Sequence, residues 1–143
     1  MRIVSLHCKT IEIVSIEPAL KLELCDHDEA GARRPFANCL FALSTVHPDD
    51  NARAATRAAQ GLSRLAYENN VRSVVLNPFA HLDDKNAPPA ACLPLLDHMT
   101  ATLQAIAEDE ARWDVTRLAF GWRKEWINMH VLPGVFDQRF LHT

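Results

Sequence analysis

The clearest hydrophobic pattern lies between residues 71 and 81, VRSVVLNPFAH, where an apolar run ends abruptly. The β-branched and apolar residues of this run suit a buried strand and are too few for a helix. Pro78 has no N–H and pushes Asn77 toward an extended conformation, so strand pairing should end there. His81 is therefore expected just past the carboxyl end of a core strand, where α/β folds keep their ligand crevices.

The residues before this run predict a strand and a helix. Residues 37–46 are apolar and end at His47-Pro48, which predicts a central strand. Alanine and leucine then recur at helical spacing as far as Asn69-Asn70, and Asp49 or Asp50 is predicted to cap this helix. With the strand 71–77, this part reads as a strand–helix–strand unit, which is right-handed if the two strands are parallel neighbours.

The rest of the chain predicts shorter strands around a second helix. We expect strands at 2–7 and 11–16 joined by a tight turn at Lys9-Thr10, followed by a polar loop at 23–35. A second helix is expected from about Pro89 to Arg112, and it properly starts near Leu93 because Pro94 suits only a first turn. Strands at 113–120 and 122–131 flank Gly121, and the last nine residues are expected to form a short helix. The sequence thus predicts one α/β domain, residues 1–143, with a mixed sheet and two main helices.

Composition narrows the class of protein. The chain has 143 residues, 48% of them hydrophobic, and no run near the roughly 20 apolar residues of a membrane span. Since the start, MRIVSLHC, also lacks the features of a secretory signal, we expect a cytoplasmic protein without membrane contact. The four cysteines are scattered with no C-x-x-C pair, which favours free thiols over a zinc site.

Charge argues against broad, non-specific nucleic-acid binding, because the net charge is −3. It leaves room for a local basic surface, since the arginines cluster at positions 33–34, 53–64 and 117–123.

Lys124 is the second candidate for chemistry after His81. In a strand, Trp122, Lys124 and Trp126 share one face, while Arg123 and Glu125 point to the other. A lysine between two indoles is either a cation–π brace or a charge held in a partly dry pocket, and composition alone favours the brace. His81 is equally open between an ordinary histidine and one that positions or deprotonates a water.

Other reactive side chains suggest less. His7-Cys8 matches no thiol-nucleophile pattern, so a buried, inert thiol is the better interpretation. The stretch Cys25–Glu29, CDHDE, lacks metal-ligand spacing and is interpreted as a solvated loop. Asp137 follows the Leu132-Pro133-Gly134 break and matters only if the chain folds back toward Lys124. No serine-hydrolase, zinc-protease or phosphate-loop motif is present, and we expect no cofactor or metal.

Three motifs taken in order, MRIVSLHC, PFAHL and AFGWRKEW, resemble one family over nearly the whole chain. It is the editing domain found at the N-terminus of archaeal threonyl-tRNA synthetases, whose fold is shared with D-aminoacyl-tRNA deacylases. The resemblance implies hydrolysis of serine wrongly esterified to threonine tRNA, with the terminal hydroxyl of the RNA taking part. A missing methyl group discriminates by only about 1–3 kcal/mol, so a second, hydrolytic site is required.

The resemblance also implies roles for particular residues. His81 matches the pocket histidine, Lys124 matches the pocket lysine, and Pro78, Phe79 and Ala80 form the wall. His7, Cys8, Trp122 and Arg123 are expected near the substrate, and Asp137 falls near the family's later acidic residue. Three departures concern specificity: Cys8-Lys9 replaces serine and aspartate, Arg123 replaces an aromatic residue, and Asp137 replaces a glutamate.

The implied partners are the 3′ acceptor end of tRNA, a threonyl-tRNA synthetase and a second copy of the chain. Because the sequence lacks the synthetase's catalytic and tRNA-binding domains, we expect either a freestanding editor that acts in trans or a domain whose partner supplies the affinity for tRNA. Two alternatives stay open. One is a non-catalytic module of the same fold that binds an amino-acid-like or nucleotide ligand or a protein. The other, a D-amino-acid-specific deacylase, is weaker because the motifs of that relative are not evident.

Overall fold

The computed structural model describes residues 1–110, 112–132 and 138–142. In these residues the elements are β1 (Arg2–Pro18), η1 (Leu22–Leu24), β2 (Arg33–Thr45), α1 (Ala52–Glu68), β3 (Ser73–Pro78), η2 (Ala80–Leu82), α2 (Pro89–Glu110), β4 (Asp114–Arg117), β5 (Trp122–Val131) and β6 (Gln138–His142). Here η denotes a short 3₁₀ helix.

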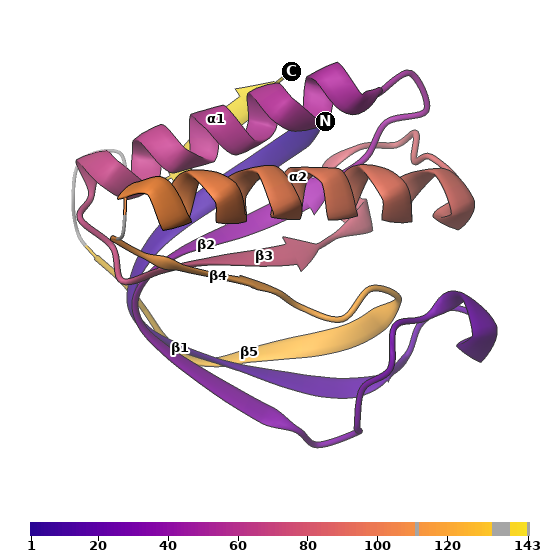
Figure 1. Ribbon diagram of the computed structural model, residues 1–143. Coiled ribbons are helices and arrows are strands. Elements are labelled where there is room, and N and C mark those ends of the chain that lie inside the picture. Colours follow the sequence, from indigo (N-terminus) through magenta and orange to yellow (C-terminus); the bar gives the residue numbers. More distant parts are fainter. Residues whose placement is uncertain (111, 133–137, 143) are drawn as a thin grey trace.

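The strands form a mixed sheet in the order β4-β3-β2-β1-β5, with β6 also paired to β1. The β2–β3 and β3–β4 pairs are parallel, and the three pairs that β1 makes are antiparallel. Helices α1 and α2 lie side by side over one face of the parallel strands (Figure 1). The α/β class and the parallel strand–helix–strand unit are thus confirmed.

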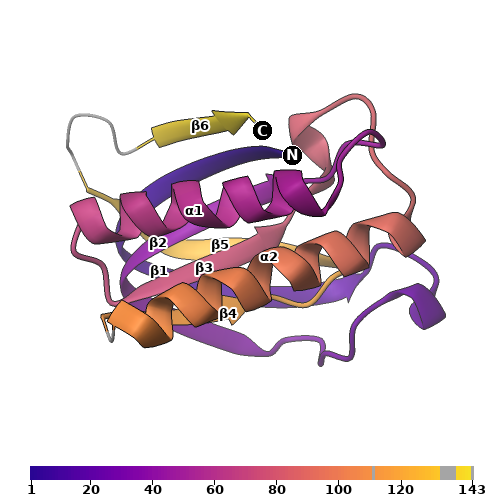
Figure 2. The same ribbon diagram turned by 45° about the horizontal axis from the view of Figure 1, so that its top comes forward.

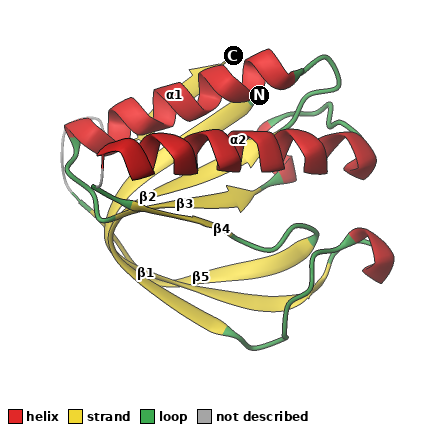
Figure 3. Ribbon diagram, viewed as in Figure 1, coloured by secondary structure: helices red, strands yellow, loops and turns green. Residues whose placement is uncertain are grey.

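Strand β1 is one long, curved element (Figure 3). The predicted hairpin turn at Lys9-Thr10 is wrong. Thr10 still pairs with Ala37 on β2, so the ladder continues past these residues. The polar pair marks an irregularity instead, because the β1–β5 register shifts on both sides of Thr10 and the facing Asn38 has φ 47°. Polar residues here signal a bend of the strand, not its end.

Two further predictions at helix boundaries need correction. Asn51, not Asp49 or Asp50, caps α1, because its side chain accepts a hydrogen bond from Ala54 N at 3.1 Å. Asp50 instead accepts from the amino group of Met1 and the amide of His47. Helix α2 starts at Pro89, not near Leu93, and contains Pro94. Because proline has no N–H, the carbonyl of Ala90, four residues earlier, lacks its helical hydrogen bond, and Ala90 is exposed.

The chain end also differs from the prediction. Residues 138–142 form a strand, not a helix, and pair antiparallel with the first half of β1. Figure 2 shows β6 beside the start of β1. The first half of β1 would otherwise have an unpaired edge, so tertiary pairing decides the conformation here. Strand β4 is shorter than predicted. Leu118 N still donates to Leu76 O at 2.9 Å, but the chain then leaves the sheet, and Phe120 and Gly121 line the cavity described below.

The apolar side chains form two clusters, one on each face of the sheet. The first packs α1 and α2 onto β2 and β3, with Leu62, Val74 and Met99 at its centre. The second contains Phe41, Val75 and Leu118, with Phe79 and Trp126 packed against it. The second cluster thus joins the end of β3 to β5.

The cap of α1 gives a first test. Asn51→Ala removes the acceptor for Ala54 N and should lower the free energy of unfolding by about 1 kcal/mol. Asp49→Ala is the matched control, because the Asp49 side chain is 93% exposed and should change stability little. Urea unfolding of both variants measures the difference, and equal losses would contradict the assignment of the cap.

Candidate functional site

A cavity of about 470 Å³ lies where β2 and β3 reach their carboxyl ends. Its wall is built from segments far apart in the sequence: the end of β2, the loop after β3, the start of α2 and the turn into β5. Ligand crevices of α/β sheets occur at this edge of the strands. The volume falls in the usual range for pockets that enclose a small molecule.

The loop after β3 is fixed to the end of β2 by two hydrogen bonds. Phe79 N donates to Ser44 O at 2.9 Å, and the Thr45 hydroxyl donates to the carbonyl of Phe79. Pro78 and Ala80, which the family resemblance assigns to the wall, line the cavity beside Phe79. Backbone bonds of this kind place the loop without using its side chains, which stay available to a ligand.

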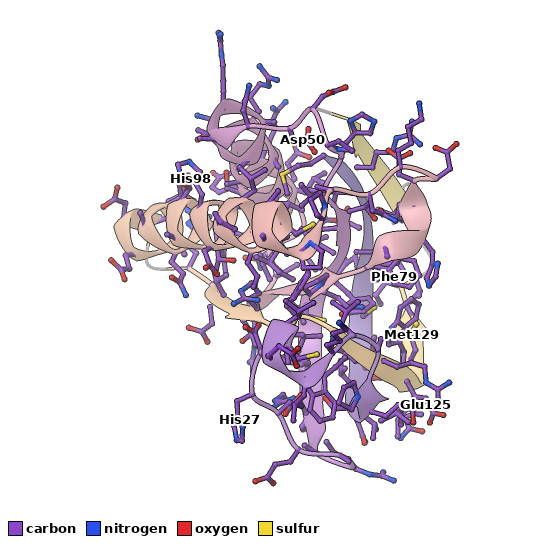
Figure 4. The ribbon with its side chains drawn as sticks, turned by 90° about the vertical axis from the view of Figure 1, so that its right-hand side faces the viewer. His27, Asp50, Phe79, His98, Glu125 and Met129 are labelled. Atoms are coloured by element: carbon purple, nitrogen blue, oxygen red, sulfur yellow. The ribbon has the colours of Figure 1, made fainter. Side chains whose placement is uncertain are left out.

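His81 lies at the exposed rim of the cavity, and its ring packs edge-on against Phe79 with the centroids 5.1 Å apart. Phe79 in turn contacts Trp126 of β5 at 5.8 Å. Figure 4 shows Phe79 between the helical layer and the lower strands, on the same side as Met129. The aromatic contacts thus connect the histidine segment to the lysine strand.

Lys124 enters the cavity from β5, and its ammonium donates to the carbonyls of Ala119 at 2.6 Å and Trp122 at 3.3 Å. Burial lowers the pKa of Lys124 to about 8, with the carboxylate of Asp28 opposing the shift. An ammonium has three N–H donors, so two are used and one is left for a ligand or a water. Among the described residues the cation–π contact is Arg112 over Tyr67, not Lys124 over an indole. The geometry therefore favours the pocket charge over the brace.

Trp122 and Trp126 line the cavity on the same face as Lys124, as alternation predicts. Arg123 also borders the cavity, but its side chain is 65% exposed and pairs with Glu17 at 2.9 Å. Arg123 therefore lies at the rim, and it can bind a phosphate only if its ion pair with Glu17 breaks.

The other predicted residues lie elsewhere. His7 hydrogen-bonds Asn38 at 2.8 Å, and Cys8 is fully buried opposite Cys39 on β2; neither lines the cavity. Asp137 lies outside the described residues, so its expected approach to Lys124 stays a prediction.

No set of three or more potential metal ligands occurs in residues 1–110, 112–132 and 138–142. In the same residues no helix is long and apolar enough to cross a membrane.

Sequence reasoning missed four polar side chains of the cavity, Ser44, Thr45, Asn77 and Asn86, and two of them are buried without a partner in the part of the chain that the structure describes. Ser44 and Asn77 are 3% and 2% exposed, and both line it. The Ser44 hydroxyl and the Asn77 Oδ1 have no hydrogen-bond partner among the described residues. A buried polar atom without a partner is costly, and such groups are typical of functional sites. Asn77 could have been noticed as a polar residue ending an apolar strand, but nothing in the sequence distinguishes Ser44.

The fold is a small α/β domain with a cavity at the carboxyl edge of its parallel strands, lined by both apolar and polar side chains. Comparison with known families is more specific. The model of the archaea-specific editing domain of threonyl-tRNA synthetase matches residues 1–132, and the chain belongs to this family.

Individual relatives agree with this assignment. The chain is 29% identical over 126 residues to the threonine–tRNA ligase of Cenarchaeum symbiosum, which covers 88% of this chain and 19% of the ligase. It is also 29% identical over 124 residues to the threonine–tRNA ligase editing subunit of Aeropyrum pernix, covering 87% of this chain and 28% of that subunit. The chain thus spans less than a third of the length of these relatives.

A solved structure is similar over the whole domain. The c-Myc DNA unwinding element binding protein superposes with a TM-score of 0.70 at 8% identity, covering 100% of this chain and 99% of that chain. At this identity the likeness shows the fold alone. It confirms the D-aminoacyl-tRNA deacylase-like fold expected from the sequence.

The burial of Lys124 gives a pH test of the site. The pKa of Lys124 is about 8 in the folded protein, below the 10.5 that is usual for a lysine in an unfolded chain. Between these values the unfolded chain binds more protons, so this group makes the folded state more stable as pH rises from about 8 toward 10.5. The uncharged variant Lys124→Met lacks this gain, and the difference should be about 1–3 kcal/mol. Urea unfolding of both proteins at pH 7.5 and 10 measures it, and parallel pH dependence would contradict a buried ammonium.

Proposed function

We propose that this domain hydrolyses the ester bond of a mischarged aminoacyl-tRNA, with seryl-tRNA(Thr) as the substrate. One observation carries the proposal: in a chain of the editing-domain family, His81 and Lys124 border one cavity although 43 positions separate them in the sequence. The cavity volume suits a small amino acid on a ribose better than a long stretch of RNA.

The proposed mechanism gives Lys124 the central role. Its third N–H donates to the substrate carbonyl or to the attacking water, and Ala119 and Trp122 fix its direction. With a pKa of about 8, the Lys124 side chain is mostly charged at pH 7, and this pKa is close enough to neutral pH for the side chain to exchange a proton.

His81 and the backbone complete the site. The imidazole of His81 orients the water from the rim, and its ring nitrogen can accept a proton from that water. The tetrahedral oxygen needs N–H donors, and the amide of Phe79 is already bonded to Ser44 O. The amides of Ala80 and His81 are therefore the donors that we propose. The water oxygen bonds to the ester carbonyl carbon, the bond to the ribose oxygen breaks, and the departing oxygen takes up the proton that the water loses. The terminal hydroxyl of the RNA takes part in this transfer, so no covalent protein nucleophile is required.

Ser44 and Asn77 give the substrate pocket a polar interior. Their unpartnered atoms need hydrogen bonds that a ligand with a hydroxyl or ammonium group supplies and a purely apolar ligand does not. Seryl esters have both groups. Polar recognition of this kind rejects analogues without the donor more strongly than an apolar pocket rejects an extra methyl.

The tRNA acceptor end is the proposed macromolecular partner, in association with a threonyl-tRNA synthetase. Exposed arginines at positions 53 and 57 on α1 would supply salt-sensitive phosphate contacts. We also propose that the domain acts in trans, in the cytoplasm.

Lys124→Ala should abolish release of serine from seryl-tRNA(Thr), and His81→Ala should slow it by about 10²–10⁴-fold. Lys9→Ala is the matched control, because Lys9 is exposed and does not line the cavity. Ester half-lives with excess protein measure the rates. An unchanged half-life with wild-type protein, together with stabilisation by a seryl-adenosine mimic, would favour the non-catalytic binding module.

A homodimer is the proposed assembly. The sheet face opposite the helices has partly buried apolar side chains, including Leu6, Phe36 and Met129, that a second copy would cover. Sedimentation at micromolar concentration should give about twice the chain mass of 16.1 kDa. A single species of the chain mass would contradict the dimer.

A further inference from the structure

The loop formed by Cys25, Asp26, His27 and Asp28 packs against residues 117–122, the segment that leads to Lys124. The sequence suggested a solvated loop, and His27 does point into solvent (Figure 4). Its two neighbours differ: Asp26 is only partly exposed, and the side chain of Asp28 is 2% exposed. The loop therefore has one exposed side and one side directed into the domain.

Asp26 makes four hydrogen bonds to residues 117–122, the segment that connects β4 to β5. Its carboxylate Oδ2 accepts from Phe120 N at 2.9 Å and from Arg117 Nη1 at 2.8 Å. Its backbone N donates to Phe120 O at 3.0 Å, and its backbone O accepts from Trp122 Nε1 at 2.9 Å. One residue thus fixes both the main chain and an indole of the segment that turns into β5.

The turn itself depends on close contact with this loop. Gly121 has φ +85°, and a Cβ at this position would lie 2.8 Å from Cys25 Sγ. The carbonyls on either side, those of Ala119 and Trp122, are the two that hold the Lys124 ammonium. A shift of this turn would therefore move both acceptors and change the direction of the remaining Lys124 N–H.

We propose that Asp26 is a positioning residue of the deacylation site, acting through the turn at 119–122 to aim Lys124 at the substrate. The proposal rests on the proposed function, in which Lys124 contacts the reacting ester. Asp26 touches no substrate in this arrangement; its effect passes through Phe120 N and the Trp122 indole.

Charge gives the proposal a readout that a merely structural role would not move. The charged groups that act on Lys124 are Asp28, Arg34, Asp26 and Arg117, in decreasing order of effect. The two carboxylates raise the pKa of Lys124, and the two guanidinium groups lower it. Asp26→Asn removes one negative charge, so the pKa of Lys124 should fall. Arg117→Gln removes one positive charge and should raise it.

Because the proposed donor is the charged form of Lys124, catalysis should decline as pH rises through its pKa. In Asp26→Asn this decline should occur at lower pH, and in Arg117→Gln at higher pH. We expect Asp26→Asn to lower kcat for seryl-tRNA by about tenfold or more with a smaller change in KM, since misplaced catalytic groups cost rate more than binding. Asp97→Asn and His27→Ala are the matched controls.

The controls separate positioning from general stability. Asp97 is the other carboxylate on Arg117, at 3.1 Å, and has no hydrogen bond to the turn; His27 is in the same loop but faces outward. In both variants kcat should stay within about twofold of the wild-type value, and the decline of kcat should occur at the wild-type pH. Wild-type kcat and profile in Asp26→Asn, or an equal loss in Asp97→Asn, would overturn the proposal.

A second measurement separates this proposal from the proposed function. NMR titration of ¹³C-labelled lysine reports the pKa of Lys124 without any substrate. Wild-type protein without deacylase activity would refute the proposed function. An unchanged pKa of Lys124 in both Asp26→Asn and Arg117→Gln would refute the positioning role. Shifts of this pKa in opposite directions in the two variants would support it, and this result does not require Asp26→Asn to be stable enough for kinetics at higher temperature.

Discussion

The pairing of β1 with three partners is the constraint on which the site depends. Strand β1 is antiparallel to β2 along almost its whole length and to β5 along its second half. Its curvature turns β5 across the end of β3, so that Lys124 lies opposite Ser15 in register and still faces the loop after Pro78. A straight β1 would leave the lysine strand in the plane of the parallel sheet. The irregular register around Thr10 therefore has a functional consequence: it gives the sheet the bend that closes one side of the cavity.

Much of this architecture follows from the sequence, and the failures have physical causes. Helix α1, the end of β3 at Pro78 and the bounds of β5 follow from apolar spacing and proline chemistry, which act locally. The break predicted at Lys9-Thr10 failed because polar residues in a long, bent strand look like a turn when the neighbouring strands are unknown. The terminal helix failed for a related reason. Residues 138–142 are extended because β1 offers them an edge, and no local propensity reveals a distant partner.

The site was predictable to a different degree. Alternation in β5 places Lys124 between Trp122 and Trp126 on one face, and the strand end places His81 at a ligand edge. That the two face one cavity came from family resemblance, since residue spacing does not fix how β5 lies relative to β3. Asp26 was hidden because an acidic loop is usually solvated, and only the turn that it contacts distinguishes it from Glu29. Ser44 was hidden because a small polar residue near a strand end has no pattern of its own.

The polar groups of the cavity share one energetic logic. Lys124 is held partly out of water, and Ser44 and Asn77 leave buried atoms without partners, so all three reduce the stability of the empty domain. The surrounding structure tolerates this because it is fixed independently: Phe41, Phe79 and Trp126 form an aromatic contact chain, and Asp26 and Asp28 are each paired with an arginine. Those ion pairs supply nearly balanced charge around the ammonium, so its low pKa reflects burial more than repulsion. A ligand that supplies hydrogen bonds to Ser44, Asn77 and the remaining N–H of Lys124 would therefore bind a site whose shape is already set, and most of its binding free energy would go into its own orientation instead of rearrangement of the protein.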